Sequence, residues 1–304
     1  MKKDLTKLMD LTKEEILDIL NLADQMKYNL KRGKEHKVLA GKSLAMIFQK
    51  ASTRTRVSFE VGMYQLGGQA LFLSSNDLQI GRGEPVQDTA RVLSRYVDGI
   101  MIRTFEQSEV EDLAKWSTIP VINGLTDFAH PCQVLADLMT IREYLSSLEG
   151  VKLAYIGDGN NMCNSLIVGG LTCGLKVSIA VPKGYDPHPD ILAFTKKYPA
   201  HFTLTRSPQE AAQSADVLVT DVWASMGQED EAAARKKAFA GFQINHEMLD
   251  LADPKAIVLH CLPAHRGEEI TAEALEAYAG PVFDEAENRL HAQKAVMALL
   301  MGRE

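Results

Sequence analysis

The order of apolar and polar segments constrains this chain more than any other feature of its sequence. Short apolar runs alternate with segments in which apolar residues recur every three or four positions. In the first half the apolar runs are SLAMIF (43–48), ALFLSS (70–75), GIMIR (99–103) and PVING (120–124). Runs of this length are typical of strands, and the segments between them are typical of amphipathic helices. The first half therefore predicts an α/β fold in which helices join parallel strands.

The same alternation begins again after residues 147–150, SLEG. The apolar runs of the second half are VKLAYI (151–156), KVSIAV (176–181), FTLT (202–205), VLVTDVW (217–223) and AIVLHC (256–261). A chain of 304 residues is long enough for two domains, each with its own core. We expect two α/β domains, 1–147 and 148–304, each a parallel sheet flanked by helices, with a functional site in the cleft between them. The final helix, 290–302, is expected to pack back on the first domain.

The composition limits the classes of protein to which this chain can belong. A formal net charge of −7 argues against general nucleic-acid binding, which needs a basic stripe. No apolar run approaches the roughly 20 residues that span a bilayer, and the first residues lack the apolar segment of a secretory signal. The four cysteines lie far apart without a CxxC pair, as is usual in a reducing compartment. We expect a cytoplasmic protein that binds small molecules, with neither nucleic acid nor membrane as a partner.

A short basic sequence, STRTR at 52–56, follows the first apolar run of this acidic chain. A helix is expected to begin there, and a helix start presents free backbone N–H groups and the positive end of its dipole. The guanidinium groups of Arg54 and Arg56 would add two charged donors. Together these groups predict a site for a small phosphate dianion. A solvated basic turn is the alternative, because an arginine pair by itself indicates nothing more specific.

Polar residues also follow several of the other apolar runs. They are Arg103, His130 and Gln133 in the first half, and Asn160, Asn161, Asp221, Ser225, Cys261 and His265 in the second. In an open parallel sheet, ligands bind beyond the carboxyl ends of the strands. Polar groups at this edge in both halves therefore predict one ligand site built by two domains.

Two other kinds of site are weaker interpretations of the same residues. The run YIGDGNN resembles half of a dinucleotide-binding loop, but the third glycine is missing and no acidic residue ends the next apolar run. His130, Cys132, His260, Cys261 and His265 are of types that bind zinc, yet none has the spacing of a structural zinc site. We expect neither a metal nor a nicotinamide cofactor.

Three candidate residues also have ordinary structural explanations. His130 could cap a helix or lie in the core, Cys261 could be a small buried apolar residue, and Asp221 could cap a helix or loop. The functional interpretations are a polar ligand contact for His130 and acceptance of a substrate ammonium by Asp221. His260 is not expected to activate Cys261, because neighbours on an extended strand point to opposite faces.

The motifs, taken in order, give the chain a family resemblance. They are STRTRVSFE, GRGEPVQDTARVLSRY, HPCQ, DGNN, DVWASMG and HCLPAHRGEE, and they span nearly the whole sequence. STRT and HPCQ resemble the aspartate/ornithine transcarbamoylase superfamily, and SMG with HCLP is similar to its ornithine carbamoyltransferase branch. The resemblance implies a carbamoyl-phosphate domain, an ornithine domain and a homotrimer. It also implies carbamoyl transfer to the δ-amine of L-ornithine, in arginine metabolism, without a cofactor.

The resemblance further assigns residues to the two substrates. Carbamoyl phosphate would be bound by Ser52, Thr53, Arg54, Thr55, Gln79, Arg103, His130, Gln133, Cys261, Leu262 and Arg289. Ornithine would be bound by Asn161, Asp221, Ser225 and Met226. The residues expected to act on the reacting atoms are Arg103, His130, Asp221 and Cys261. Gln79 would reach into the site of a neighbouring subunit.

The chain departs from the family pattern just before the basic sequence. FEKPSTRTR is usual there, whereas Gln49 and Ala51 replace the Glu and Pro in this chain. The missing proline loosens the turn before Ser52, and the missing carboxylate removes a possible partner of the arginines. Neither change removes a phosphate donor. Putrescine, aspartate or an acylated ornithine is the alternative acceptor within the family, and a ligand sensor without turnover is the alternative outside it.

Overall fold

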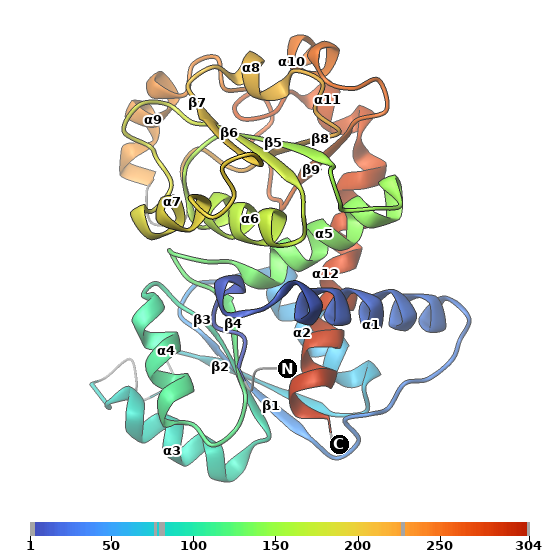
Figure 1. The fold of residues 1–304 in the computed structure, drawn as a ribbon. Coiled ribbons are helices and arrows are strands. Elements are labelled where there is room, and N and C mark those ends of the chain that lie inside the picture. Colours follow the sequence, from blue (N-terminus) through green and yellow to red (C-terminus); the bar gives the residue numbers. More distant parts are fainter. Residues whose placement is uncertain (1–3, 76–77, 79–82, 226–228, 303–304) are drawn as a thin grey trace. The chain divides into compact units, whose positions relative to one another are not determined.

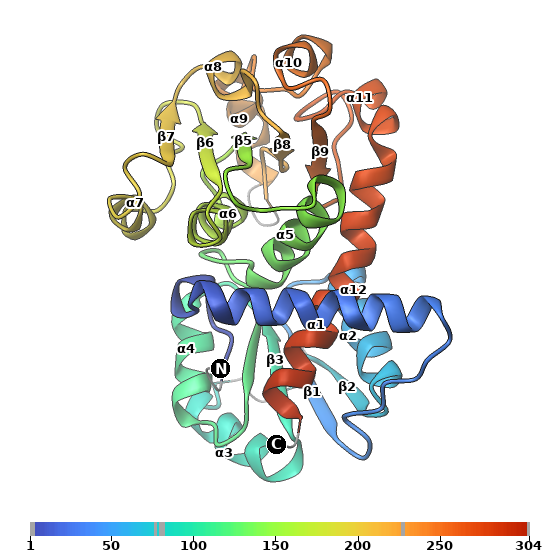
Figure 2. The same cartoon turned by 45° about the vertical axis from the view of Figure 1, so that its right-hand side comes forward.

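The structure is a computed structural model that describes residues 4–75, 78, 83–225 and 229–302. Its contacts divide the chain into unit 1, Met1–Met139 with Asn288–Glu304, and unit 2, Thr140–Glu287. Each unit contains one parallel sheet flanked by helices, which confirms the expected α/β class (Figures 1 and 2). The division falls inside the helix α5 (Pro131–Leu145), earlier than the expected 147/148, because this one helix contributes residues to both units.

Unit 1 is built on a four-stranded sheet with the order β2-β1-β3-β4. Its strands are β1 Ser43–Phe48, β2 Gln69–Ser74, β3 Gly99–Arg103 and β4 Val121–Leu125. The two central strands are buried along almost their whole length, whereas β2 at the edge is largely exposed. Parallel strands that are covered on both faces read as continuous apolar runs, which is why the sequence predicts β1 and β3 with the bounds observed.

Helices cover both faces of this sheet. They are α1 Lys13–Lys31, α2 Thr53–Gln65, α3 Val86–Tyr96, α4 Gln107–Trp116, the start of α5 and the end of α12 (Ala279–Met301), with a short 3-10 turn at Leu8–Asp10. α3 and α4 lie side by side on one face (Figures 1 and 2). The end of α12 packs closely on α2, since a Cβ at Gly62 would lie 2.8 Å from Cε of Met297.

Unit 2 is built on a five-stranded sheet with the order β7-β6-β5-β8-β9. Its strands are β5 Lys152–Ile156, β6 Lys176–Ala180, β7 Phe202–Thr205, β8 Val217–Thr220 and β9 Ile257–His260. Its helices are α6 Asn161–Thr172, α7 Pro189–Thr195, α8 Pro208–Ala212, α9 Ala232–Ala238, α10 His246–Leu251 and α11 Ala272–Ala277, with a 3-10 turn at Glu229–Glu231. Both ribbon views show α6 and α7 together on one face of the sheet, away from α8 and α10 (Figures 1 and 2).

Two elements differ from the lengths that the sequence predicts. β8 ends at Thr220 rather than at 223, because the Val222 N–H donates to the Asp221 carboxylate at 2.8 Å instead of continuing the ladder. α12 begins at Ala279 rather than near 290, since its first turns carry polar residues that weaken the apolar pattern. Its later residues belong to unit 1, where Lys294 donates to Gln65 at 2.8 Å.

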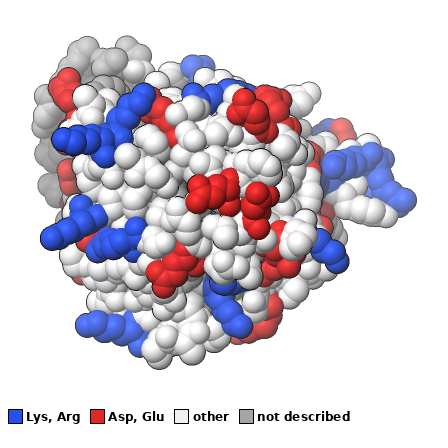
Figure 3. Space-filling model, turned by 90° about the horizontal axis from the view of Figure 1, so that it is seen from above, with Lys and Arg blue, Asp and Glu red and all other residues white. Residues whose placement is uncertain are grey.

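The charge distribution on the surface and the hydropathy of the helices bear on which partners the chain can have. Figure 3 shows a face on which Lys and Arg side chains are interspersed with those of Asp and Glu. Among the described residues, none of the helices is both long and apolar enough to cross a membrane.

Candidate functional site

The strand orders place one topological switch point in each sheet. In unit 1 the chain winds from β1 to β2 and then returns to β3 on the other side of β1. In unit 2 it winds from β5 through β6 and β7 and returns to β8 on the other side of β5. In open α/β sheets, ligands bind beyond the carboxyl ends of the strands at such points. The candidate residues gather at both of them.

In unit 1 the basic sequence forms the start of α2, directly after β1. Ser52 is the residue before the helix, and its hydroxyl accepts the Thr55 N–H at 3.2 Å. Thr53 is exposed and Arg54 is half-buried in the first turn. This turn therefore begins as the sequence predicts, with backbone N–H groups and the positive dipole end at the edge of the sheet.

The second arginine of the basic sequence does not join this group. Arg56 donates to Glu60 at 3.0 Å, and its guanidinium carbon lies 3.7 Å from the centre of the Phe72 ring. In this structure Arg56 faces Glu60 and Phe72, and its predicted part in the anion site stays a prediction. Residues two apart on a helix point to different sides, so Arg54 and Arg56 diverge. Gln49 is also occupied elsewhere, because its amide donates to Glu109 at 2.5 Å.

Arg289 of α12 connects two helices of unit 1 at this place. Its guanidinium donates to Gln133 Oε1 at 2.7 Å and to Thr55 Oγ1 at 3.2 Å, while its Nε donates to Gln293 Oε1 at 3.0 Å. Arg289 is 3% exposed, and Thr55 and Gln133 are each 1% exposed. Gln293 in turn donates to the Ser58 hydroxyl at 2.7 Å. Gln293 was not predicted, and only its spacing of four from Arg289 on one helix could have indicated it.

His130 precedes α5 and is buried among the cationic groups of unit 1. Burial lowers its pKa well below 6.5, and the charges of Arg289, Arg103 and Arg54 lower it further. Arg103 ends β3 and is buried as well. We name Arg54, Thr55, Arg103, His130, Gln133 and Arg289 the arginine cluster. It presents three guanidinium groups and a neutral imidazole, which suits an anion with several oxygen acceptors.

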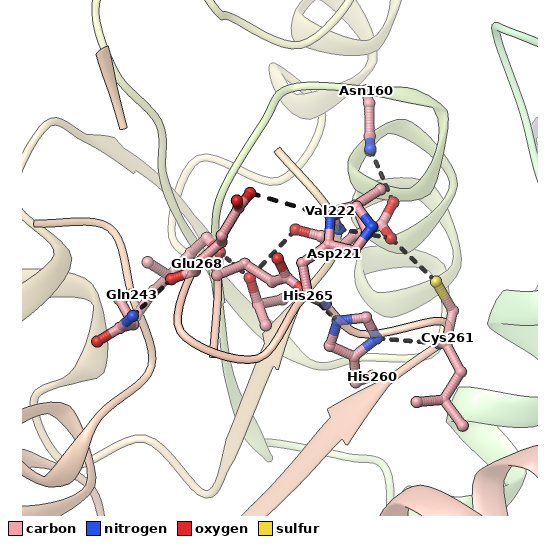
Figure 4. A network of polar contacts seen from close by, with 12 residues as sticks. Asn160, Asp221, Val222, Gln243, His260, Cys261, His265 and Glu268 are labelled. Carbon is pink, nitrogen blue, oxygen red and sulfur yellow. Dashed lines mark hydrogen bonds and ion pairs between the residues drawn. The ribbon is translucent and has the colours of Figure 1, made fainter. Parts of the chain in front are cut away.

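In unit 2 the corresponding place holds carboxylate and amide groups. Asp221, the residue after β8, accepts from Asn160 Nδ2 at 2.8 Å through one oxygen and from the Cys261 thiol at 3.1 Å through the other (Figure 4). Asp221 is 6% exposed. We name Asn160, Asp221 and Cys261 the aspartate cluster. An anionic group with amide and thiol neighbours is suited to bind an ammonium group.

The turn between β5 and α6 positions the amide side of this cluster. Asn160 caps α6, and its Oδ1 accepts the N–H groups of Met162 and Cys163 at 3.0 and 3.1 Å. Gly159 has no room for a side chain, because a Cβ would lie 2.4 Å from the Tyr185 carbonyl oxygen. Asn161 is the first residue of α6 and is buried. Asn160 therefore contacts Asp221, and the role of Asn161 toward the amino-acid substrate stays a prediction.

The residues after β9 position the thiol side. His260 and Cys261 point apart as expected, since the imidazole contacts Glu269 at 3.0 Å and accepts the Leu262 N–H at 2.9 Å (Figure 4). Leu262 has a φ of 56° and is half-buried. None of the four cysteines forms a disulfide, and Cys261 alone of them is partly exposed. Burial raises the pKa of the Cys163 thiol well above its ordinary value, so Cys261 is the candidate thiol.

One ion pair of this region was not predicted. Arg235 of α9 donates to Asp158 at 2.8 Å, and both side chains are less than one-tenth exposed. Burial raises the pKa of Asp158 from 3.8 to about 6, although the nearby Arg235 lowers it. Asp158 belongs to the DGNN motif, which is one of the motifs that carry the family resemblance. Arg235 lies in α9 beside two other basic residues, Lys236 and Lys237, and the sequence alone does not distinguish it from them.

A metal site has one candidate set among the described residues. His265, Glu268 and Glu269 each offer a ligand atom, and these atoms lie within 4.8 Å of one another. His265 is exposed, and carboxylates commonly gather on surfaces without an ion. His130 and Cys132 belong to unit 1, and His260, Cys261 and His265 belong to unit 2, so the zinc interpretation draws on residues of separate units.

The comparison with protein families also divides the chain into two domains, but it assigns residues 288–300 to the second domain, whereas the contacts assign them to unit 1. Residues 3–143 match the carbamoyl-P binding domain of the aspartate/ornithine carbamoyltransferases, and residues 149–300 match their Asp/Orn binding domain. The chain belongs to the aspartate/ornithine carbamoyltransferase family. The resemblance carried by the motifs is thereby confirmed.

Known members of the family resemble the chain over nearly its full length. The ornithine carbamoyltransferase of Syntrophotalea carbinolica is 60% identical over 99% of this chain and 100% of its own. The solved ornithine carbamoyltransferase of Pyrococcus furiosus has a TM-score of 0.94 at 53% identity, covering 98% of this chain and 96% of its own. The anabolic ornithine carbamoyltransferase of Campylobacter jejuni has a TM-score of 0.92 at 45% identity, covering 99% of each chain.

The structure distributes the carbamoyltransferase residues between the two units. Ser52, Thr53 and the arginine cluster lie in unit 1, and Asn161, Asp221, half-buried Ser225, Cys261 and Leu262 lie in unit 2. Gln79 and Met226 lie outside the described residues. The predicted contact of Cys261 and Leu262 with carbamoyl phosphate therefore involves residues of unit 2, whereas the other described carbamoyl-phosphate residues lie in unit 1.

Proposed function

We propose that this carbamoyltransferase transfers the carbamoyl group of carbamoyl phosphate to the δ-amine of L-ornithine, giving L-citrulline and phosphate. The relatives named ornithine carbamoyltransferase, up to 60% identical, support ornithine as the acceptor. One observation carries the proposal. Two clusters of opposite chemistry occupy the switch points of two sheets, one suited to a phosphate and the other to an ammonium group.

The arginine cluster supplies the groups that the donor substrate needs. The start of α2 and Arg54 would hold the phosphate, and Ser52 and Thr53 would add hydroxyl and backbone donors. Arg103 and Thr55 would donate to the carbonyl oxygen as it gains negative charge. His130 acts as a neutral donor, because its pKa is held well below 6.5 by burial and by the neighbouring guanidiniums.

Arg289 and Gln133 complete the donor side. Arg289 closes the phosphate side, and Gln133 faces the carbamoyl nitrogen. They already bind each other at 2.7 Å, so a substrate would join an ordered pair of side chains.

The aspartate cluster supplies the groups that the acceptor needs. Asp221 would receive the α-ammonium group of ornithine, with Asn161, Ser225 and Met226 as further contacts to its amino-acid end. Cys261 and Leu262 would line the reacting centre. The neutral δ-amine attacks the carbamoyl carbon, a tetrahedral intermediate forms, and phosphate leaves and can take the proton released by nitrogen. This sequence of steps requires neither a metal nor a redox cofactor.

The site is proposed to lie in the cleft between the two domains, 1–147 and 148–304, with one substrate held by each. Holding both reactants in one place supplies much of the rate enhancement of a two-substrate reaction. Two relatives named anabolic favour a role in arginine biosynthesis. The four free cysteines favour the cytoplasm as its compartment.

We further propose that the chain forms a homotrimer in which the loop of Gln79 reaches a neighbouring site. Exposed apolar side chains on α2 and on the edge strand β2 support an interface there, namely Val57, Val61, Tyr64, Leu71 and Phe72. An apolar edge strand is otherwise a site of aggregation. Arg54→Ala and Gln79→Ala trimers should each be inactive, and refolding an equal mixture should restore roughly a quarter of the sites. No recovery in the mixture would place Gln79 outside a neighbour's site.

The test of the function is an acceptor panel. The enzyme is given carbamoyl phosphate with L-ornithine, putrescine, L-aspartate or N-acetyl-L-ornithine, and carbamoylated product and phosphate are measured together. We expect citrulline from ornithine, with kcat/KM at least about a hundredfold above that for the other three. A preference for another amine would change the assigned acceptor. Binding of both substrates without product would identify a ligand sensor.

A further inference from the structure

Arg235 and Asp158 form a buried ion pair that the proposed reaction does not use. The donor–acceptor distance is 2.8 Å, and the side chains are 9% and 8% exposed. Taking two charges out of water costs several kcal/mol, so such a pair is weak evidence of a purely stabilising role. The other contacts of the two residues indicate a further role.

The guanidinium of Arg235 contacts four segments of unit 2. The same Nη1 that binds Asp158 donates to the Trp223 carbonyl at 2.9 Å, and Nε donates to Glu231 at 2.9 Å. The guanidinium carbon also lies 5.1 Å from the centre of the Tyr185 ring. Arg235 therefore ties the turn after β5 and the residues after β8 to the start of α9.

The positions of these contacts relate them to the aspartate cluster. Asp158 precedes Asn160 by two residues, and Trp223 follows Asp221 by two. The Asn160–Asp221 hydrogen bond and the Asp158–Arg235–Trp223 bridge therefore join the same two loops at neighbouring points. Ser225, a predicted contact of the amino-acid substrate, follows Trp223 by two residues.

The parts that Arg235 connects are themselves held firmly. Trp223 stacks on Phe239 with ring centres 5.7 Å apart, and Tyr185 packs edge-on against Phe239 at 4.8 Å. The Gly159 N–H donates to the Tyr185 carbonyl at 3.0 Å. Arg235 thus links a packed aromatic group to the turn that carries Asn160, and a planar guanidinium can satisfy several acceptors at fixed angles where a lysine cannot.

We propose that Arg235, with Asp158, is a positioning residue for the amino-acid substrate: it sets the spacing between Asn160 and Asp221 and the direction of the chain toward Ser225. Arg235 does not touch the substrate. The inference rests on the proposed function only in that the amino-acid substrate is taken to be ornithine. Loss of Arg235 then affects the amino-acid half of the site and leaves the arginine cluster of unit 1 unchanged.

The test is Arg235→Met, with Lys236→Met as the matched control. Lys236 is the next residue of the same helix and is exposed, and its contact is a 3.4 Å ion pair with Glu268. The expected result for Arg235→Met is an ornithine KM raised about tenfold or more, with the carbamoyl phosphate KM within about twofold of the unchanged enzyme. Lys236→Met should leave both values unchanged. A rise of both KM values together, or of neither, would overturn the proposal.

Removing one member of a buried pair can prevent folding, because it leaves the other charge without a partner. The double variant Arg235→Met with Asp158→Asn removes both charges and keeps the volume nearly constant. It should fold, and it should still raise the ornithine KM because the Trp223 carbonyl has lost its donor. An unchanged ornithine KM in this variant would overturn the proposal even if Arg235→Met is insoluble.

Backbone hydrogen exchange separates this inference from the proposed function. Arg235→Met should speed exchange in 157–161 and 221–225 of unit 2, and Lys236→Met should not. This outcome needs no substrate. If the unchanged enzyme makes no citrulline, the proposed function fails while the exchange result still decides the positioning role. Unchanged exchange in both segments would refute that role.

Discussion

The two units present the same arrangement with opposite chemistry. In each, the strand order reverses beside a central strand, and a helix begins directly after that strand, α2 after β1 and α6 after β5. In unit 1 this place gathers buried guanidinium groups, and in unit 2 it gathers Asp158 and Asp221. The shared topology explains where the candidate residues lie, whereas the side chains alone decide what each place can bind.

The charges around the two sites also affect the pKa values of His130 in unit 1 and of Asp158 in unit 2. Burial lowers the pKa of His130, and the guanidiniums around it add to that effect. Burial raises the pKa of Asp158 to about 6, and the charge of Asp221 raises it while Arg235 lowers it. In both units burial favours the neutral form, but unit 1 thereby keeps a neutral imidazole among cations, and unit 2 keeps a carboxyl that titrates near physiological pH.

The largest expected effect comes from the helix start of unit 1. Arg54→Ala should lower kcat/KM at least about a hundredfold, because removing a charged donor from a reacting phosphate costs roughly 3 kcal/mol of transition-state stabilisation. Steady-state kinetics with citrulline detection measures this loss. Arg56→Ala is the matched control and should stay within about threefold of the unchanged enzyme, since Arg56 binds Glu60 and lies over Phe72. Equal losses would mean that both arginines serve the anion.

A substitution in the aspartate cluster should affect the other substrate. Asp221→Asn keeps the shape of the side chain but removes the charge that would bind an ammonium group. We expect the ornithine KM to rise about tenfold to a hundredfold, in line with a charge-assisted hydrogen bond of roughly 1.5–3 kcal/mol. Initial rates at varied ornithine and saturating carbamoyl phosphate give this value. An unchanged ornithine KM would mean that Asp221 has a structural role, through its contacts with Asn160, Val222 and Cys261.

The neutral His130 predicts a pH dependence of stability. Its folded pKa lies well below 6.5, so below about pH 6.5 the unfolded chain takes up a proton that the folded chain does not. The free energy of unfolding should therefore fall as the pH falls from 7 to 5, by up to about 2 kcal/mol for this one group. Urea unfolding of the unchanged chain and of His130→Gln should show the smaller fall in the variant. Equal slopes would contradict a neutral buried imidazole.

The smallest effect is expected from Asp158. Its carboxyl loses its charge as the pH falls through about 6, so its bond to Arg235 weakens in acid. Binding of L-norvaline, which lacks the δ-amine, should therefore weaken about twofold to fivefold between pH 7 and 5.5, measured calorimetrically with carbamoyl phosphate present. The other charged groups near Asp158 are Asp221 and, through Arg235, Glu231. Asp158→Asn should remove the pH dependence, and an equal dependence in this variant would contradict this role of Asp158.

The sequence predicts the parts of each unit that local pattern determines. β1 and β3 are buried on both faces and therefore appear as short apolar runs with clear ends. Ser52 follows the end of β1, so its place follows from strand direction alone, whereas Asp221 follows β8, which ends at Thr220 and not at the predicted 223. The direction of Arg56 could also have been predicted, because it lies two residues from Arg54 on one helix.

The parts of the site that the sequence does not predict depend on contacts between residues far apart in the chain. Arg235 lies beside Lys236 and Lys237, and no local pattern distinguishes it from them. Its burial depends on distant partners, among them Asp158, 77 positions away, and the Trp223 carbonyl. Arg289 likewise reaches Thr55 and Gln133 from the other end of the chain. Such contacts are set by packing, which a single sequence does not reveal.

The assignment of one substrate to each unit is tested most directly by titrating carbamoyl phosphate into three proteins in a calorimeter. These are the unchanged enzyme, Arg54→Ala and Asp221→Asn. We predict that Asp221→Asn binds carbamoyl phosphate within about threefold of the unchanged enzyme, whereas Arg54→Ala binds it at least about tenfold more weakly. Equal weakening in both variants would contradict the assignment, because a carboxylate of unit 2 would then contribute to the donor substrate as much as the arginine of unit 1.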